Sequence, residues 1–238
     1  MLKIKTALKL GPKTKDDEYD RRKREMKELG SAIHSYKAAM ESAKLAMKRV
    51  VNSWLDVRKA FEGLADHVTI PDCTRDCTSA FVASIDRAEA SLLPEYVTAI
   101  DSNVIPAISD LRSLYEECER LEKSRNKVMH EYDVYRNEVA KKESEYQRKS
   151  KDISTSKSYS SDVAKRDALE TSFGEADQKF KDTHDYLMQN RVIACSAALC
   201  AFAQCSATFM EGVSSEFTAL KSTSEQVLRT VRDGAQMG

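Results

Sequence analysis

The chain has 238 residues, enough for one hydrophobic core or one elongated domain, and it contains only 7 glycines and 4 prolines. Charged residues make up 32% of it and aromatic residues only 7%, a composition typical of long helices and coiled coils. The net charge is zero, with 38 basic and 38 acidic side chains. This argues against a nucleic-acid-binding protein, which would be basic over the whole domain.

Positive charge is concentrated in two segments of the sequence. Residues 1–15 carry five lysines and no acidic residue, and residues 147–166 carry six basic and two acidic residues. Because the net charge is zero, the remainder of the chain is acidic. Two basic segments on an acidic body indicate a local anionic partner.

The first ten residues, MLKIKTALKL, alternate apolar and basic types. Wound as a helix, they place one group of apolar side chains on a common face: Met1, Ile4, Ala7 and Leu8. One interpretation is an interfacial helix that folds on a membrane. A disordered tail and a targeting peptide are the alternatives. Residues 1–15 are therefore predicted to be a basic amphipathic segment that precedes a domain of residues 16–238.

A first long helix is predicted from apolar residues that recur at alternating steps of three and four. They are Met26, Leu29, Ile33, Tyr36, Met40, Ala43, Met47, Val50, Trp54, Val57, Phe61, Leu64 and Val68. Such a heptad seam predicts a helix that supercoils with its neighbours. The sequence TIPD at 69–72 ends it, because the residue before a proline is disfavoured in helical conformation.

A second seam predicts a second long helix. It consists of Leu93, Val97, Ile100, Val104, Ala107, Leu111, Leu114, Cys118, Leu121, Arg125, Val128, Tyr132, Tyr135 and Val139, and Arg125 alone interrupts its apolar character. Pro94 and Pro106 lie inside the pattern and predict bends, because proline lacks a backbone donor and pushes on the preceding turn. The sequence STSKSYSSD at 154–162 has the composition of a loop.

A third long helix follows that loop. Its first seam is Leu169, Phe173, Ala176, Phe180 and Leu187, and its later seam is Val192, Cys195, Leu199, Phe202, Ser206, Phe209 and Val213. No linker rich in glycine and proline divides the chain. The sequence therefore predicts one all-α domain of three helices, each roughly 50–75 residues long.

Residues 192–210, VIACSAALCAFAQCSATFM, are apolar on nearly every side of a helix. A membrane span and the buried centre of a helix bundle are the two explanations. Gln204 and several serines and threonines interrupt the stretch, and Arg191 and Glu211 bracket it, which favours the bundle. A single chain offers only two other helices to cover it, so we expect a homodimer. Its expected interface residues are Val192, Cys195, Leu199, Phe202 and Phe209.

Candidate metal and catalytic residues are sparse. In SRNKVMHEYDVYRNEV, the His130–Glu131 pair lacks the second histidine of a zinc-protease helix. The C-x3-C pair Cys73 and Cys77 has no partner pair, and three further cysteines recur every five residues, so they point in different directions: Cys195, Cys200 and Cys205. No nucleophile–base pair or phosphate loop is present. We expect no metal, no cofactor and no enzymatic activity, and cysteines without a signal peptide predict a cytoplasmic protein.

Three motifs in order resemble the BAR (Bin–amphiphysin–Rvs) domain family over nearly the whole chain. KTKDDEYDRRKREMKEL at 13–29 is similar to the K-T-x-D-x-E-[FY] opening of the first BAR helix. KSRNKVMHEYDVYRNEV at 123–139 resembles the K-R-x-K-x-x-x-D-Y-D-x-x-R strip of the second, with Ser124 and Glu131 as departures. FGEADQKFKDTHDYLMQNRV at 173–192 resembles the segment of the third helix that ends in L-x-x-x-R. The amphipathic N-terminus resembles that of the N-BAR subgroup.

The resemblance implies a coiled-coil crescent homodimer of three long, kinked, antiparallel helices per chain, with a six-helix central bundle. It implies a cytoplasmic, peripheral membrane protein that senses or generates membrane curvature on anionic phospholipids, as in endocytosis or trafficking. The expected lipid-binding residues are Lys3, Lys5, Lys9, Arg136, Lys141, Lys142, Arg148, Lys149, Lys151, Lys157, Lys165 and Arg166. The alternative is a cytoskeletal or coiled-coil scaffold that binds protein partners without lipid.

The residues around the His130–Glu131 pair are expected to have structural or surface roles. We expect Asp133, off the seam, to make a polar contact with a neighbouring helix or with Arg125. We expect His130 to be a surface residue. For Arg136, an ordinary solvated charge is the alternative to a lipid-binding role.

Overall fold

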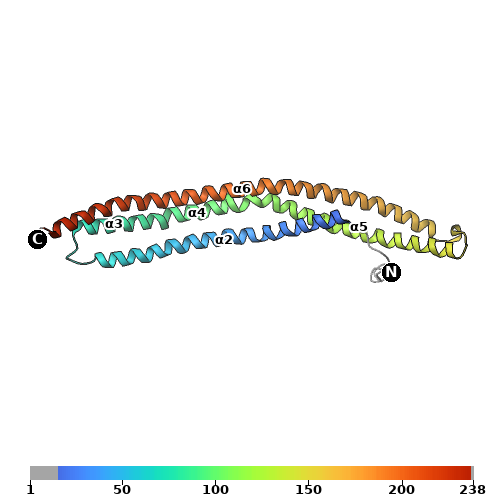
Figure 1. Ribbon diagram of the computed structural model, residues 1–238, viewed down its shortest axis with the longest axis horizontal. Coiled ribbons are helices and arrows are strands. Elements are labelled where there is room, and N and C mark those ends of the chain that lie inside the picture. The colour runs from blue at the N-terminus through green and yellow to red at the C-terminus, as the bar shows by residue number, and fades with distance from the viewer. Residues whose placement is uncertain (1–15, 237–238) are drawn as a thin grey trace. The chain divides into compact units, whose positions relative to one another are not determined.

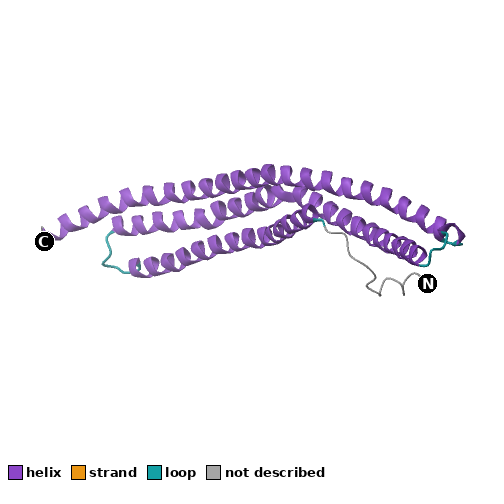
Figure 2. Ribbon diagram, turned by 45° about the vertical axis from the view of Figure 1, so that its right-hand side comes forward, coloured by secondary structure: helices purple, strands orange, loops and turns teal. Residues whose placement is uncertain are grey.

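The computed structural model describes residues 16–236. All regular elements in that range are helical, and they form three passes joined by connections at 66–71 and 149–158 (Figures 1 and 2). The prediction of an all-α chain with three long helical passes is confirmed. The predicted amphipathic segment 1–15 lies outside the described residues.

The first pass is helix α2, Asp17–Ala65. Asp16 precedes it, and its Oδ1 accepts a hydrogen bond from the backbone N–H of Tyr19 at 2.9 Å, so it satisfies one donor that a helix start leaves free. Three acidic residues in the first turn complement the helix dipole: Asp17, Glu18 and Asp20. The helix ends before Val68, which the sequence pattern placed on the seam and which is 88% exposed in the connection.

The second pass combines regular and irregular helical turns. Its elements are α3 (Asp72–Arg87), the π-helical turn η1 (Ala88–Leu92), α4 (Leu93–Ala99), the π-helical turn η2 (Ile100–Val104), the 3-10 turn η3 (Ile105–Ile108) and α5 (Ser109–Arg148). A proline ring clashes with the carbonyl four residues earlier. For Pro94 and Pro106 that carbonyl lies inside η1 and η2 respectively, where the wider π turn makes room for the ring.

The third pass is helix α6, Tyr159–Gln236, reached through the 3-10 turn η4, Ile153–Thr155. The predicted loop at 154–162 is shifted: the connection spans 149–158, and Tyr159 already begins the helix. Ser160, Ser161 and Asp162 belong to its first turn. Serine and aspartate are favoured both at helix starts and in loops, so composition alone does not separate the two.

The end of α5 is closed by a Schellman motif. The N–H of Lys151 donates to the carbonyl of Tyr146, and the N–H of Ser150 donates to the carbonyl of Gln147, both at 3.1 Å. Ser150 has a φ of 47°, the left-handed conformation that this motif requires at that position. Glycine usually occupies the position because a Cβ is unfavourable there, so Ser150 is held at a local energetic cost.

Replacing Ser150 by glycine is therefore expected to stabilise the end of α5 by about 1 kcal/mol, since it removes the left-handed penalty of a Cβ. The midpoint of urea denaturation should rise with an unchanged slope. Alanine at the same position keeps the Cβ and is the matched control. If the glycine variant is no more stable than the alanine variant, the left-handed backbone at residue 150 does not carry the proposed energetic cost.

The chain divides into two compact units. The described part of unit 1 comprises residues 16–31 and 110–192, and that of unit 2 comprises 32–109 and 193–236. In unit 1, α5 and the first part of α6 form an antiparallel hairpin with the start of α2 beside it (Figure 1). The core of unit 2 consists of Val51, Leu93, Tyr96, Ile100, Val104 and Phe209.

The seam of the second pass is confirmed, because each of its residues from Leu93 to Val139 is buried or half-buried. In α2 the seam shifts by one residue: Val51 is buried and the predicted Val50 is exposed. In α6 the chain buries Ala194 and Ala198 in place of the predicted Val192, Cys195 and Leu199. These two helices carry apolar residues on more than one face, and around residues 192–199 of α6 the chain's own core uses the face with the smaller side chains.

Candidate functional site

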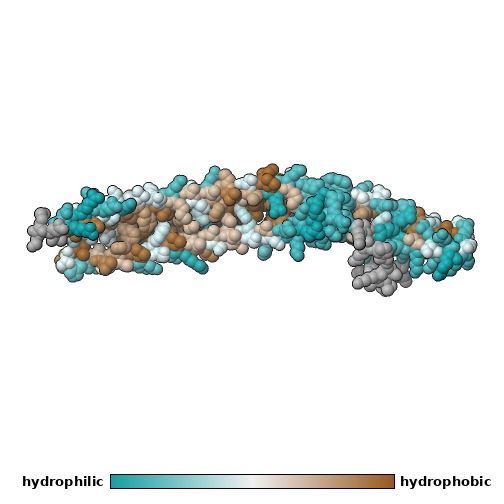
Figure 3. All heavy atoms as spheres, in the orientation of Figure 1, coloured by the Kyte–Doolittle hydropathy of each residue, from teal (hydrophilic) through white to brown (hydrophobic). Residues whose placement is uncertain are grey.

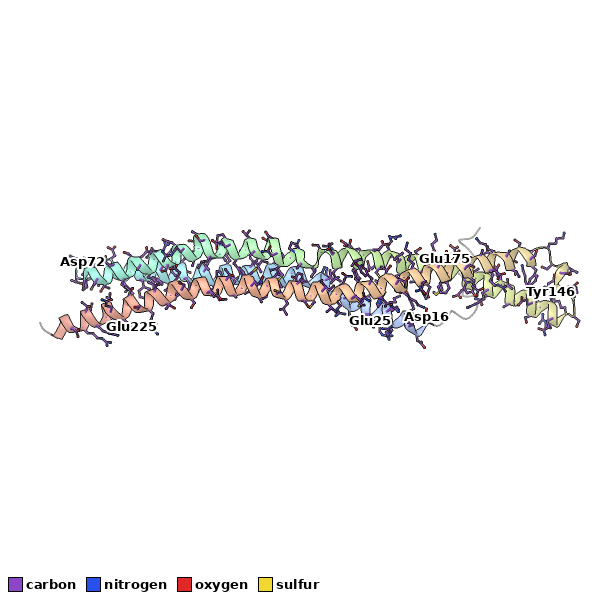
Figure 4. The ribbon with its side chains drawn as sticks, turned by 90° about the horizontal axis from the view of Figure 1, so that it is seen from above. Asp16, Glu25, Asp72, Tyr146, Glu175 and Glu225 are labelled. Carbon is purple, nitrogen blue, oxygen red and sulfur yellow. The ribbon has the colours of Figure 1, made fainter. Side chains whose placement is uncertain are left out.

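The charged segment at 147–166 forms the closed end of the α5–α6 hairpin in unit 1. We define residues 141–166 as the basic hairpin end; it carries eight basic and four acidic side chains. Figure 4 labels Tyr146, which belongs to this end and lies near the point where α5 turns into the connection. Only ten residues connect α5 and α6 there, so the ends of the two helices lie close together. The basic side chains of the hairpin end come from both helices and from the connection between them.

Six of the predicted lipid-binding residues are exposed and make no ion pair with the described residues. They are Lys141, Arg148, Lys149, Lys151, Lys157 and Lys165. An exposed ammonium or guanidinium group without a carboxylate partner remains available to bind an external anion. The site is thus a cluster of available cations, some of which lie on α5 or α6 and some on the connection between them.

Three other predicted residues are engaged within the chain. Arg136 pairs with Asp133 at 2.9 Å and stacks over the Tyr132 ring at 5.6 Å. Lys142 pairs with Asp162 and donates to Ser158 Oγ at 2.6 Å. Arg166 pairs with Asp167 at 2.6 Å. Each of these cations is already part-neutralised, so its contribution to an anion site is smaller than that of the six.

The remaining predicted residues, Lys3, Lys5 and Lys9, lie outside the described part of the chain.

Local hydrogen bonds order the connection at the hairpin end. Asp152 Oδ1 accepts from the backbone N–H of Ser154 at 2.9 Å, and Oδ2 accepts from the Ser154 hydroxyl at 2.6 Å. The hydrogen bonds from the Ser154 hydroxyl and backbone lower the pKa of Asp152 below its usual range. Tyr159 donates its hydroxyl to Glu143 at 2.7 Å, which ties the start of α6 to α5. The loop cations are consequently presented on a defined backbone.

A second surface is apolar and belongs almost entirely to unit 2. Of the fourteen large apolar side chains that the described structure leaves exposed, twelve belong to this unit. They are Leu45, Val50, Val57, Phe61, Leu64, Val68, Ile193, Leu199, Met210, Phe217, Leu228 and Val231. We call these residues the apolar face. In Figure 3, brown surface gathers over the part of the chain formed by α2, α3, α4 and late α6, whereas the α5 part is mostly teal.

The predicted dimer residues divide between exposed positions and the core. Val192 and Leu199 are each 67% exposed, and Cys195 is also exposed, so they are available to a second chain. Phe202 is half-buried against the core of unit 2. Phe209 is only 3% exposed and packs on Tyr96, with ring centroids 5.2 Å apart. Phe209 is therefore a residue of the chain's own core, and its assignment to a dimer interface is corrected.

Within the described residues, one helix is long and apolar enough to cross a membrane, and it is α6. Only 11% of its most apolar window is buried in the single chain. Most of this window is therefore not buried by its own chain, although Ala201, Phe202 and Cys205 of the same helix are half-buried against the core of unit 2.

A buried charge cluster anchors the three passes of unit 1. Arg125, the one polar interruption of the second seam, is fully buried and pairs with Asp177 at 2.6 Å and Asp16 at 2.5 Å. Its guanidinium also lies 4.1 Å from the centre of the Tyr19 ring. Burial alone would raise the pKa of Asp177, but hydrogen bonds from Lys181 and Arg125 hold it below its usual value.

We expected Asp133 to make a polar contact with a neighbouring helix or with Arg125, and the ion pairs that form do not join Asp133 to Arg125. Arg125 takes Asp16 and Asp177 as its partners, and Asp133 pairs with Arg136 on its own helix. Asp133 is also buried, although the sequence pattern placed it outside the apolar seam of α5. His130 is exposed, as expected for a surface residue. In the described part of the chain, no three histidine, cysteine or acidic side chains form a group that could hold a metal ion.

A buried histidine forms a second polar cluster in unit 1. His184 Nδ1 lies 2.9 Å from Arg22 Nη1, and because arginine only donates, Nδ1 must be the acceptor and the neutral ring carries its proton on Nε2. His184 Nε2 lies 3.3 Å from Glu25 Oε2 without hydrogen-bond geometry. Arg22 also pairs with Asp185 and Glu18. Burial lowers the pKa of His184 and outweighs Asp185, which raises it, and the nearby charge of Arg22 lowers it further.

The free energy of unfolding is expected to fall as the pH drops below about 6.5, the ordinary pKa of histidine. Because the folded pKa is lowered, the unfolded chain binds a proton that the folded chain does not, so stability is complete above this value and decreases below it. The carboxyl groups with lowered pKa act in a separate, more acidic window, as for Asp185. Melting temperatures at pH 7.5 and 5.5 should therefore differ less in a His184→Gln variant than in the wild type. Equal differences in the two proteins would contradict the role of His184.

Comparison with known proteins gives no assignment for this chain. No protein-family model matches it, and no curated protein matches it either.

Proposed function

We propose that the protein is a membrane-binding homodimer of the BAR type. The observation that carries the proposal is the separation of two unlike surfaces along the chain. Unit 1 holds the six available cations of the basic hairpin end, and unit 2 holds nearly all the exposed apolar side chains. One surface is suited to anionic lipid and the other to a second chain.

The apolar face supports dimerisation. Large exposed apolar surfaces are uncommon on monomeric proteins and mark interaction sites. The face draws on α2 and α6, whose heptad-spaced apolar residues continue on sides that the chain's own core does not use. A second copy supplies helices with the same spacing, so a two-fold arrangement would bury both faces at once. In the proposed dimer, each chain contributes three helices to a central bundle of six.

The basic hairpin end supports binding to an anionic surface. Each Lys or Arg near such a membrane contributes about 1 kcal/mol, and salt screens the attraction over about 8 Å at physiological ionic strength. A dimer doubles the six available cations. If both hairpin ends engage together, the second binds at high effective concentration, which makes affinity depend on whether the membrane curvature places lipid under both. Curvature sensing or generation in membrane remodelling, endocytosis or trafficking follows as the proposed role, at the cytoplasmic face as a peripheral protein.

Vesicle co-sedimentation tests the proposal. The protein should pellet with phosphatidylserine vesicles, remain in the supernatant with phosphatidylcholine vesicles, and bind less at physiological than at low salt. A scaffold protein that binds other proteins through its helices would stay in the supernatant under all conditions. A chain that uses α6 as a membrane span would instead require detergent for solubility and would resist extraction by high salt.

A further inference from the structure

The basic hairpin end contains eight hydroxyl side chains between residues 150 and 161, and they differ in their contacts. Four are hydrogen-bonded within the chain: Ser154, Thr155, Ser158 and Tyr159. Ser156 is half-buried, and Ser160 and Ser161 lie within α6. Ser150 alone is exposed and outside a helix, with a hydroxyl that makes no hydrogen bond to the described residues.

The charge around Ser150 is strongly positive. Arg148 and Lys149 precede it, Lys151 follows it, and all three are exposed and make no ion pair with the described residues. Protein kinases select substrates in part by charge patterns around the accepting hydroxyl. Cations on both sides of a serine suit a kinase whose substrate groove is acidic.

The backbone of Ser150 favours local opening. A kinase groove must accommodate the segment around the hydroxyl, which requires the end of α5 to unfold locally. The left-handed φ of 47° is unfavourable for a serine, so the closed Schellman motif is less stable than it would be with glycine. Exposed helix ends open at low free energy, and this end is both exposed and strained.

We propose that Ser150 is a phosphorylation site for a basophilic serine/threonine kinase, and that its phosphate releases the basic hairpin end from anionic membrane. The second half of this statement rests on the proposed function. In the reaction, Ser150 Oγ attacks the γ-phosphorus of Mg·ATP and forms the new O–P bond. The bond between that phosphorus and the β–γ bridging oxygen breaks, ADP leaves, and a base of the kinase takes the hydroxyl proton.

The phosphate acts on membrane binding in two ways. It adds a charge of about −1.5 to −2 beside cations that face the lipid, and its oxygens can pair with the flanking arginine and lysines. It also places negative charge at the C-terminal end of α5, where the helix dipole disfavours it, so the cap that presents Lys151 is loosened. Phosphorylation is expected to lower the affinity for vesicles by about 10- to 30-fold. This difference between the phosphorylated and the unmodified protein should become smaller at high salt.

The first experiment locates the modification without using membrane binding. The full chain is incubated with Mg·ATP and the catalytic domain of a basophilic serine/threonine kinase, and the sites are mapped by mass spectrometry. Ser150 is expected to be the first residue modified, and Ser150→Asn to abolish this phosphorylation. Modification of other hairpin serines while Ser150 stays unmodified would overturn the site, whatever the protein does with lipid.

The second experiment measures the release. Ser150→Asp adds one negative charge, and Ser150→Asn is its neutral control, because both residues tolerate the left-handed conformation. On phosphatidylserine vesicles, the phosphorylated protein and the Asp variant should bind more weakly than the Asn variant, which should match the wild type. If the wild type, the phosphorylated protein and the Asp and Asn variants all bind equally, phosphorylation of Ser150 does not release the hairpin end from the membrane. If the wild type fails to bind, the proposed function and the switch both fall, while the mass spectrum still decides whether Ser150 is the modified residue.

Discussion

Replacing Ile193 and Leu199 together by aspartate is expected to convert the proposed dimer into a folded monomer. Both side chains belong to the apolar face and are 67% exposed in the single chain, so the substitution leaves the chain's own core intact. In a two-fold dimer the two substitutions bury four carboxylates per assembly, and each unpaired buried charge costs several kcal/mol. Sedimentation velocity at micromolar concentration should give a dimer for the wild type and a monomer for the variant.

Two controls separate dissociation from unfolding. Ser172→Asp introduces a carboxylate at an exposed position of the same helix in unit 1 and should remain dimeric. Phe209→Asp places the charge in the core of unit 2 and should lose helical circular dichroism rather than simply dissociate. A double variant at 193 and 199 that stays dimeric would show that the second copy binds elsewhere, and a monomeric wild type would remove the dimer altogether.

Reversing Lys149, Lys151 and Lys157 to glutamate should lower the affinity for phosphatidylserine vesicles by at least about a hundredfold at low salt. These three lysines occupy the connection of the basic hairpin end and make no ion pair with the described residues. Each reversal removes an attraction and adds a repulsion, about 2 kcal/mol per site before screening. The melting temperature should be unchanged, because exposed charges contribute little to stability.

The matched control replaces three exposed cations of late α6 by glutamate, so its net charge changes by the same amount as in the hairpin variant. These cations are Lys221, Arg229 and Arg232. If attraction depends only on net charge, both triple variants will lose affinity equally. The proposed site predicts a much larger loss for the hairpin variant. Unchanged binding of the hairpin variant would show that its lysines are merely solvated and that lipid contact lies elsewhere.

The sequence predicted the second pass best because its seam is covered within the chain on every turn. Leu111, Cys118 and Leu121 are buried as the heptad spacing requires. The same spacing was less informative for α2 and α6, which carry apolar residues on several sides. Periodicity identifies an apolar stripe, but it does not say whether the covering helix belongs to the same chain. For this reason Val50 and Leu199 follow the predicted pattern and are nevertheless exposed.

The buried polar clusters were beyond the reach of the sequence pattern. Arg125 was recognised only as an interruption of the seam, since its partners Asp16 and Asp177 lie on other passes. A buried arginine needs a carboxylate nearby, so its position on the seam was the available signal. His184 had a weaker signal: it follows Phe180 and precedes Leu187 at seam spacing, where an apolar residue is usual.

The position of the basic segment at the connection between the second and third passes was predicted correctly, because runs of charged residues are visible in the sequence. Its division into available and paired cations depended on three-dimensional contacts. Lys142 meets Asp162 across the hairpin, twenty residues away in sequence. Arg166 instead pairs with its immediate neighbour Asp167, a contact that sequence proximity allowed but did not determine.

Hydrogen–deuterium exchange with and without phosphatidylserine vesicles tests most directly whether the basic hairpin end meets the membrane. The connection at 66–71 serves as an internal control, since it is also a loop between two helices but carries no lysine or arginine. We expect vesicles to slow exchange of the amides in 149–158 and to leave those in 66–71 unchanged. Slowed exchange at 66–71 with none at 149–158, in protein that sediments with the vesicles, would contradict the proposed membrane surface.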